Sequence, residues 1–299
     1  LVPINSSVRS GSELLMRADS ACYIAKDNGR NCIHTYAASD RDFIRRSDEL
    51  QWYNRITDAL DAGQFELYCH EIKPVLNPEE KSPHYEILLR MISDGKIIWP
   101  ADFIPAAERY LLMPRIDRWV LDAFLSEFEK KAIENFNGNS YSINLSGQSL
   151  SNDEFLDYTL QRLQGRYINP ASLTFEITET AAISNLDKAL HFIYTLKELG
   201  CTFALDDFGT GISSFEYLHD LPVDYLKIDG KFVRNIDNND VNHSIISAIT
   251  NIGHELGLKI IAEYVEDDAV MEKLKACNID YIQGFVIGKP FPLQELIKN

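Results

Sequence analysis

The sequence predicts an α/β fold, a modified (β/α)8 barrel of the TIM type, because short apolar runs alternate with longer amphipathic stretches from Phe65 onward. Eight runs have the length and β-branched content of strands, and we expect them at 65–72, 84–91, 141–146, 172–178, 202–208, 225–229, 259–265 and 281–287. Eight strands within about 235 residues favour a closed barrel over an open doubly wound sheet.

The connection between the first two strands departs from the regular barrel pattern. Residues 73–83 include Pro74, Pro78 and Pro83, and this stretch is too short for a crossover helix. We therefore expect the first strand to run antiparallel to the second.

Amphipathic patterns separate the later strands, and several end at Gly or Asn, as helices commonly do. We expect helices at 115–135, 152–165, 185–200, 241–257 and 267–277.

The first part of the chain has a different organisation. Residues 12–26 have a helical pattern, 28–31 form a turn, and 32–36 have the pattern of a short strand. Thirty-six residues are too few for an independent core, so residues 1–36 are expected to be a short α/β remnant. A charged helical pattern follows at 39–60. We divide the chain into this remnant, a linker helix at 37–56 and the barrel at 57–299.

Composition limits the classes of partner. The formal charge of −16 opposes binding to a nucleic-acid polymer. No apolar run approaches the ~20 residues of a membrane span, so we expect no membrane contact by this fragment. Five cysteines without a CxxC pair fit a reducing, cytoplasmic setting. The start at Leu1 suggests that the chain begins inside a longer gene product, which upstream domains could anchor to a membrane.

Polar or charged residues stand near the ends of seven consecutive predicted strands. They are Glu86, Asn144, Glu176 with Glu179, Asp206 with Asp207, Lys227 with Asp229, Glu263 and Gln283. In a barrel the carboxyl ends of the strands meet at one face, where active sites form. The sequence therefore predicts a site at this face.

Carboxylates that converge on a small site cannot all ionise without compensating positive charge. An all-oxygen ligand set favours Mg²⁺ or Mn²⁺ over Zn²⁺, and adjacent Asp206 and Asp207 could bridge two ions about 3.5–4 Å apart. Such a pair activates water and holds a phosphoryl group, while Lys227 and Arg90 would add positive charge near phosphate. These features predict metal-dependent hydrolysis of a phosphodiester.

Other interpretations of the same residues remain open. Asp206 and Asp207 could cap the next helix, as single acidic residues at strand ends often do. The glycines of Gly209-Thr210-Gly211 superficially match a dinucleotide fingerprint, but the third glycine is absent, which favours a flexible active-site loop. An enolase-like lyase with Lys227 as its base also fits a barrel with carboxylates at its strand ends.

The sequence resembles the EAL-domain phosphodiesterases over about residues 57–298. The resemblance rests on seven motifs in the family's order: Glu86-Ile87-Leu88-Leu89-Arg90, Asn144-Leu145-Ser146, Phe175-Glu176-Ile177-Thr178-Glu179, Asp206-Asp207-Phe208-Gly209-Thr210-Gly211, Leu226-Lys227-Ile228-Asp229-Gly230, Ala262-Glu263-Tyr264-Val265-Glu266 and Gln283-Gly284-Phe285. It implies a modified barrel that uses two Mg²⁺ or Mn²⁺ ions to hydrolyse cyclic di-GMP, a bacterial second messenger, to linear pGpG. The alternative is a catalytically weak EAL domain that acts as a cyclic di-GMP receptor.

The resemblance also implies roles for individual residues. The metal ligands, or residues around the metal, are Glu86, Asn144, Glu176, Asp206, Asp207 and Glu263. Glu263 is also the general base, and Lys227 holds the catalytic water. Substrate-binding residues are Arg90, Leu88, Gln283, Asp229 and Glu266. Glu179 stabilises the loop at 207–215, which in the family links dimerisation to activity, so a homodimer through the barrel is expected.

A second resemblance concerns the N-terminus. Arg17-Ala18-Asp19, residues 21–26 and residues 29–31 are similar to the end of a GGDEF diguanylate-cyclase domain that lacks its signature loop. This implies upstream GGDEF and sensor domains in the full-length chain and no cyclase activity in this fragment.

Several positions depart from the EAL pattern. Ile87 replaces Ala and is expected to affect packing alone, while Ile212 replaces a common Tyr and His70-Glu71 replaces Gln-Pro. Tyr264 replaces a usual Gly; strand alternation predicts that its ring points away from the ligand face, where it could crowd the neighbouring helix.

Overall fold

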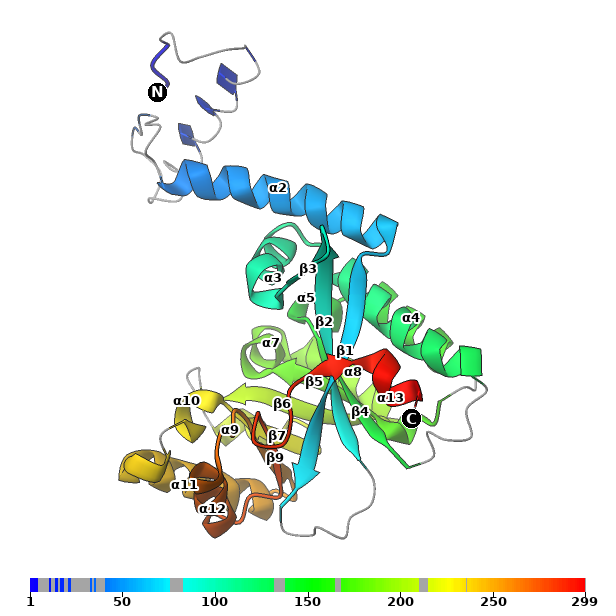
Figure 1. The fold of residues 1–299 in the computed structure, drawn as a ribbon, viewed down its shortest axis with the longest axis vertical. Helices are drawn as coiled ribbons and strands as arrows, with labels where there is room; N and C mark the ends of the chain where they lie inside the picture. The colour runs from blue at the N-terminus through cyan, green and yellow to red at the C-terminus, as the bar shows by residue number, and fades with distance from the viewer. Residues whose placement is uncertain are drawn as a thin grey trace.

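The computed structural model describes residues 1–4, scattered positions between 11 and 35, and residues 41–75, 83–131, 138–164, 168–209, 215–234 and 236–298 (Figure 1). The expected N-terminal helix and strand, and with them the GGDEF-like remnant, lie outside the continuously described residues. The same holds for residues 210–214, which include the departure at Ile212.

Ten strands form one sheet in the described residues. They are β1 (Phe65–Pro74), β2 (His84–Ser93), β3 (Lys96–Ile98), β4 (Ser140–Leu145), β5 (Leu173–Thr178), β6 (Thr202–Phe208), β7 (Tyr225–Ile228), β8 (Lys259–Ala262), β9 (Tyr281–Gln283) and β10 (Phe291–Pro292). The strand order is β10-β1-β9-β8-β7-β6-β5-β4-β2-β3, and pairing of β1 with β2 closes an eight-stranded barrel. The predicted barrel is confirmed, and each predicted strand matches an observed one.

Strand β1 runs antiparallel to both of its barrel neighbours, β2 and β9, whereas the pairs from β2 through β9 on the other side are parallel. This confirms the interpretation of the short, proline-containing connection. Two short strands lie outside the ring of eight: β3 forms a hairpin with β2, and β10 pairs with β1.

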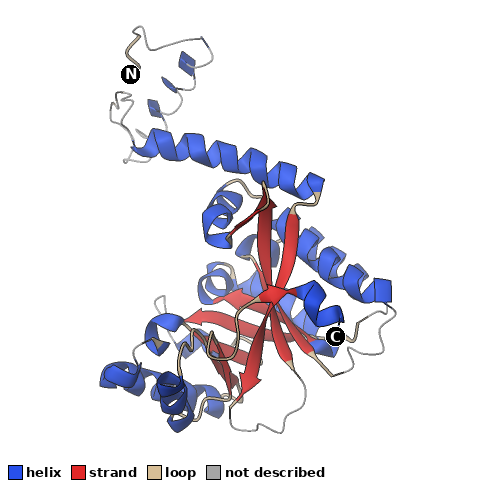
Figure 2. Cartoon of the chain, viewed as in Figure 1, coloured by secondary structure: helices blue, strands red, loops and turns tan. Residues whose placement is uncertain are grey.

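Helices cover the outside of the barrel (Figures 1 and 2). Their bounds are α2 (Arg41–Ala62), α3 (Pro100–Arg109), α4 (Met113–Lys131), α5 (Gly147–Leu150), α6 (Asp153–Leu163), α7 (Glu179–Ser184), α8 (Leu186–Lys197), α9 (Phe215–Leu218), α10 (Gly230–Val233), α11 (Asp240–Glu255), α12 (Asp268–Ala276) and α13 (Leu293–Lys298), with 3₁₀ turns η2 (Pro170–Ser172) and η3 (Ile236–Asn238). The helices predicted from the pattern correspond to α4, α6, α8, α11 and α12. None of the helices in the described part of the chain is long and apolar enough to cross a membrane.

Alternation along the strands separates an apolar layer from a polar lumen. Phe175 on β5, Phe203 on β6 and Leu226 on β7 are fully buried on the side that faces the helices. Ile87 joins this apolar layer, which agrees with the expectation that it affects packing. The intervening residues, such as Glu176 and Lys227, therefore point into the barrel.

Helix α2 runs up to the start of the barrel. Its pattern predicted a helix at 39–60, and the observed helix continues to Ala62, so that only Gly63 and Gln64 separate it from β1. Ile56 and Ala59 are fully buried in the same core as the barrel helices. The C-terminal half of this helix is therefore part of the packed barrel.

Candidate active site

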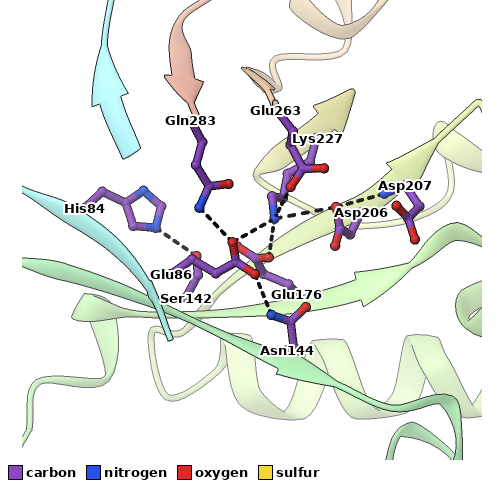
Figure 3. A network of polar contacts seen from close by, with 10 residues as sticks. All are labelled: His84, Glu86, Ser142, Asn144, Glu176, Asp206, Asp207, Lys227, Glu263 and Gln283. Carbon is purple, nitrogen blue, oxygen red and sulfur yellow. Dashed lines mark hydrogen bonds and ion pairs between the residues drawn. The ribbon is translucent and has the colours of Figure 1, made fainter. Parts of the chain in front are cut away.

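Lys227 is the centre of a polar network in the barrel lumen (Figure 3). Its Nζ lies 2.5 Å from Glu176 Oε2, 2.8 Å from Glu263 Oε1, 3.5 Å from Asp206 Oδ1 and 3.6 Å from Glu86 Oε2. These four carboxylates come from four different strands or strand ends and share one fully buried cation. The lumen therefore holds excess negative charge.

Two amides hold the Glu86 carboxylate in place. Asn144 Nδ2 donates to its Oε1 over 2.7 Å, and Gln283 Nε2 donates to its Oε2 over 2.8 Å (Figure 3). Because Asn144 is on β4 and Gln283 on β9, the carboxylate is fixed from two sides of the barrel. Two residues before Glu86 on β2, the buried His84 Nε2 contacts Ser142 Oγ on β4 at 2.8 Å (Figure 3).

Glu176 has one carboxylate oxygen without a partner. Its Oε2 accepts from Lys227, but its buried Oε1 has no hydrogen-bond partner among the described residues. A buried carboxylate oxygen without a donor is costly, and a bound cation is one of the few groups that can satisfy it.

Asp206 and Glu263, which contact Lys227, also form an acidic group with Asp207. One oxygen from each carboxylate lies within 4.8 Å of the others. Hard divalent cations bind such all-oxygen sets. Together with the unpartnered Glu176 oxygen, this donor chemistry fits the divalent ions that the sequence predicts.

Burial and neighbouring charges shift the pKa values of these groups. Burial, only partly opposed by Lys227, raises the pKa of Glu176 to about 8 and raises the pKa of Glu263 well above its ordinary value. Burial followed by repulsion from Asp206 raises the pKa of Asp207 to about 6. Although burial opposes its charge, the surrounding carboxylates hold the pKa of Lys227 well above its ordinary value. The pKa of Glu86 is lowered instead: burial would raise it, but Lys227 and the two amide donors outweigh burial.

A cavity of about 490 Å³ opens above the acidic group. The sequence-predicted residues that line it are Glu86, Leu88, Arg90, Asp206, Asp207, Glu263, Glu266 and Gln283. Asn144, Glu176 and Lys227 are not among the lining residues and belong to the polar network. The cavity therefore gives a ligand access to the acidic group.

Asp229 is placed differently from the other predicted binding residues. It does not line the cavity; its Oδ1 accepts from the backbone N–H of Lys231 over 2.8 Å and so caps α10. Its charge is one of the causes that raise the pKa of nearby Asp207. The structure thus brings Asp229 to the edge of the acidic group without facing it into the cavity.

Glu179 joins the loop after β6 to the start of α7. Its Oε2 accepts from the backbone N–H of Gly209 over 3.1 Å, and its Oε1 accepts from the hydroxyl of Tyr217. Gly209 has a φ of 92°, a left-handed conformation that favours glycine. Glu179 is fully buried and contacts both sides of the segment that contains residues 210–214.

The prediction for Tyr264 is wrong: the half-exposed ring lines the cavity. Strand β8 ends at Ala262, and Tyr264 has a left-handed φ of 55°, so alternation no longer applies at this position. The ring lies against Gly230, where an added Cβ would come within 2.3 Å of it. A left-handed backbone also explains why glycine is usual here.

Three further residues of the cavity wall were not predicted from the sequence. Arg234, Trp99 and Phe285 line it, and each belongs to an aromatic–cation pair. Arg234 lies 4.4 Å from the Tyr264 ring centroid. An exposed aromatic residue next to a motif was the available signal, but a sequence alone does not reveal which aromatic residues stay exposed.

Known proteins share both sequence and architecture with this chain. The EAL domain family profile matches residues 53–290. The cyclic di-GMP phosphodiesterase PdeB of Shewanella oneidensis is 39% identical over 286 residues, which are 95% of this chain and 33% of that protein. The bifunctional diguanylate cyclase/cyclic di-GMP phosphodiesterase MucR of Pseudomonas aeruginosa is 33% identical over 288 residues, 96% of this chain and 42% of that one.

A solved structure agrees with the fold. The complex of the PaMucR phosphodiesterase with c-di-GMP superposes with a TM-score of 0.75 at 31% identity, covering 82% of this chain and 99% of the other. This chain spans less than half the length of both curated relatives named above. The family match covers the whole barrel and all seven motifs, and the chain belongs to the EAL domain family.

Proposed function

We propose that this chain hydrolyses cyclic di-GMP to linear pGpG in a reaction that requires two Mg²⁺ or Mn²⁺ ions, and so lowers the level of a bacterial second messenger. The observation that carries the proposal is the acidic group of Asp206, Asp207 and Glu263 at the base of an open cavity, together with a buried Glu176 oxygen that has no hydrogen-bond partner in the described part of the chain. The names of PdeB and MucR, and the complex of PaMucR with c-di-GMP, support the same substrate.

The ions are assigned to residues by their position in the network. Asp206, Asp207 and Glu263 would hold ions on the cavity side, and Glu86, Asn144 and Glu176 would complete the set from the lumen. When bound, the ions would neutralise these carboxylates and polarise the phosphate and the attacking water.

The chain's own residues carry the proton and hold the reacting water. In the proposed step the water oxygen bonds to phosphorus, the O3′–phosphorus bond breaks, Glu263 takes the water proton, and the departing O3′ takes a proton from solvent. Lys227 would hold that water, because its Nζ lies 2.8 Å from Glu263 Oε1, the proposed base.

Substrate contacts are assigned to the cavity wall. The buried Arg90 guanidinium would bind a phosphate, because no carboxylate among the described residues forms an ion pair with it and planar guanidinium groups match phosphate oxygens. Leu88, Gln283 and Glu266 line the same cavity and would contact the ligand. We assign Asp229 a supporting place beside Asp207, where it caps α10.

The wider organisation of the protein follows as part of the proposal. Glu179 would couple the loop after β6 to a homodimer interface, and residues 1–36, 37–56 and 57–299 would be a GGDEF remnant, a linker helix and the phosphodiesterase barrel. The name of MucR, a bifunctional diguanylate cyclase and phosphodiesterase, supports a cyclase domain in the full-length chain; upstream sensor domains and a cytoplasmic location are part of the proposal.

The principal alternative is a cyclic di-GMP receptor that binds without turnover. The complete set of carboxylates favours hydrolysis, because a receptor has no need for the costly acidic group in Figure 3. An enolase-like lyase is disfavoured because the Lys227 ammonium is engaged by four carboxylates and is poorly placed to accept a proton from a substrate.

The test is incubation with cyclic di-GMP and Mg²⁺, followed by chromatography of the products. Hydrolysis predicts accumulation of pGpG, and Glu263→Gln serves as the control that keeps the shape of the side chain but removes the base. Binding of cyclic di-GMP without any product would establish the receptor instead. Neither binding nor product would reject both.

A further inference from the structure

Trp99 breaks a local rule of helix formation. It is the N-cap residue of α3, a position at which Ser, Thr, Asp and Asn are preferred because their side chains accept from the first turn. Its indole makes no such hydrogen bond and is 55% exposed on the surface. Local rules are broken most often where a side chain serves a function.

The indole lies against Arg90. Met91 on β2 pairs with Ile98 on β3, so Arg90 and Trp99, the next residues outward, stand opposite each other on one face of the hairpin. The Arg90 guanidinium lies 4.4 Å from the Trp99 ring centroid and 5.5 Å from that of Tyr68 on β1. Two rings therefore flank the guanidinium.

These ring contacts use none of the N–H donors of the guanidinium. One donor, on Nη1, is used by the Leu89 carbonyl over 2.7 Å. Arg90 and Trp99 line the same cavity, so an anion bound by Arg90 lies beside the indole. A nucleotide carries its base a few ångströms from its phosphate, within reach of that aromatic surface.

We propose that Trp99 is a substrate-binding residue, whose exposed indole stacks on a purine base of the ligand while Arg90 binds the adjacent phosphate. The inference rests on the proposed function for the identity of the ligand. Stacking suits this position because an indole offers a large rigid surface to the flat face of a base. It also explains a large exposed aromatic residue where a small capping residue would stabilise the helix.

Kinetics with cyclic di-GMP and Mg²⁺ test the contact. Trp99→Ala should raise KM about tenfold with kcat within about twofold of the parent, as expected for loss of one stacked base. Trp99→Phe should keep KM within about threefold, while Trp99→Leu should resemble Trp99→Ala. The matched control is Trp52→Ala, which removes a similar tryptophan–arginine pair, with Arg55 4.1 Å from the ring, on α2 outside the cavity.

Thermal unfolding separates this role from a structural one. Trp99→Ser supplies a capping hydroxyl and should raise the thermal midpoint by about 2 °C while it raises KM. A structural tryptophan would instead give a lower midpoint in Trp99→Ser and Trp99→Ala alike. That result, with KM unchanged, would overturn the inference.

Inorganic phosphate as a competitive inhibitor distinguishes a contact with the base from an effect through Arg90. If Trp99 contacts the base, phosphate should inhibit the parent and Trp99→Ala with the same inhibition constant. A constant that rises as much as KM would show that Trp99 acts only through Arg90 and would overturn the base contact. Where the parent binds cyclic di-GMP without cleaving it, the hydrolysis proposal fails alone, and the same variants are compared by dissociation constant. Absence of binding overturns both.

Discussion

The two ends of the barrel differ in how many hydrogen-bond donors each carboxylate has. At the carboxyl ends of the strands, four carboxylates share Lys227, and Glu176 Oε1 has no partner among the described residues. At the other end, single carboxylates have several donors each. Asp280, just before β9, accepts from His254, Lys259 and the backbone N–H of Ile260 over 2.7–2.9 Å.

Asp224 repeats this arrangement just before β7. It accepts from Lys197 Nζ over 2.6 and 2.7 Å and from the backbone N–H of Phe203 on β6 over 2.9 Å. Each of the two aspartates thus links the start of its own strand to a neighbouring strand. Carboxylates that have several donors, as buried Asp280 and partly buried Asp224 do, stabilise a fold, whereas a surplus of carboxylates destabilises it and points to a ligand. The contrast yields predictions for each end.

The largest effect is expected from Asp206→Asn, which removes one charge from the surplus and keeps the side-chain shape. Hydrolysis should fall about a thousandfold, equivalent to about 4 kcal/mol in the activation free energy. The thermal midpoint without metal should be unchanged or higher, because repulsion among the carboxylates is relieved. Initial rates and a thermal scan check both. Retention of more than about a tenth of the parent rate would contradict the ligand assignment.

Exchange of the metal should have the next largest effect. Mg²⁺ and Mn²⁺ should support hydrolysis, whereas Ca²⁺ should bind without turnover, because its longer bonds and higher coordination number displace the reacting groups. Added Mn²⁺ should also raise the thermal midpoint of the parent and have less effect on Asp206→Asn. Equal hydrolysis rates in Ca²⁺ and Mg²⁺ would argue against catalysis that depends on close ion geometry.

Asp280→Asn should change stability and leave catalysis unaffected. Loss of the charge weakens hydrogen bonds to Lys259 and His254 and should cost about 2–3 kcal/mol of unfolding free energy, with kcat unchanged. Although burial opposes it, these donors lower the pKa of Asp280, so its contribution is present above the unfolded pKa of about 3.9 and is lost as pH falls through the lower folded value. Denaturant unfolding at pH 7 and pH 3 should show the parent and variant converging in acid. Asp224→Asn provides the matched comparison.

The barrel and the acidic group at the carboxyl ends of its strands could be predicted from the sequence. The eight strands follow from the alternation of runs, and the antiparallel β1 follows from the short segment with its three prolines. The acidic residues were found because they stand at strand ends, where the barrel geometry forces them together. Periodicity carries this information, because it fixes which face of each strand points into the lumen.

Features outside regular strands could not be predicted in the same way. Tyr264 lies beyond the end of β8 in a left-handed conformation, which reverses the direction that alternation assigned to its ring. Trp99 stands at the start of a helix. Its contact with Arg90 depends on the β2–β3 hairpin, which was not predicted from the sequence. Asp224 and Asp280 are single acidic residues before strands, and the sequence gives no sign of donors that are distant along the chain.

Glu179→Ala tests whether Glu179, at the carboxyl end of the barrel, couples dimerisation to turnover. Its effect on the rate should be the smallest of those predicted here. The change leaves the Gly209 N–H and the Tyr217 hydroxyl without this acceptor, so Gly209, at the end of β6, and Tyr217 on α9 should be held less firmly. Asp207 closely precedes Gly209 in the chain, so turnover should fall about tenfold, about 1.4 kcal/mol, with weaker dependence on metal.

If the loop after β6 senses dimerisation, specific activity of the parent should depend on protein concentration, and Glu179→Ala should lose that dependence. Tyr217→Phe, which removes one of the two contacts to Glu179, should give an intermediate result. Steady-state kinetics over a dilution series, with the oligomeric state measured by light scattering at each concentration, separate loss of coupling from loss of the dimer. A Glu179→Ala enzyme with the turnover and concentration dependence of the parent would show that charge at this end of the barrel serves binding and chemistry alone.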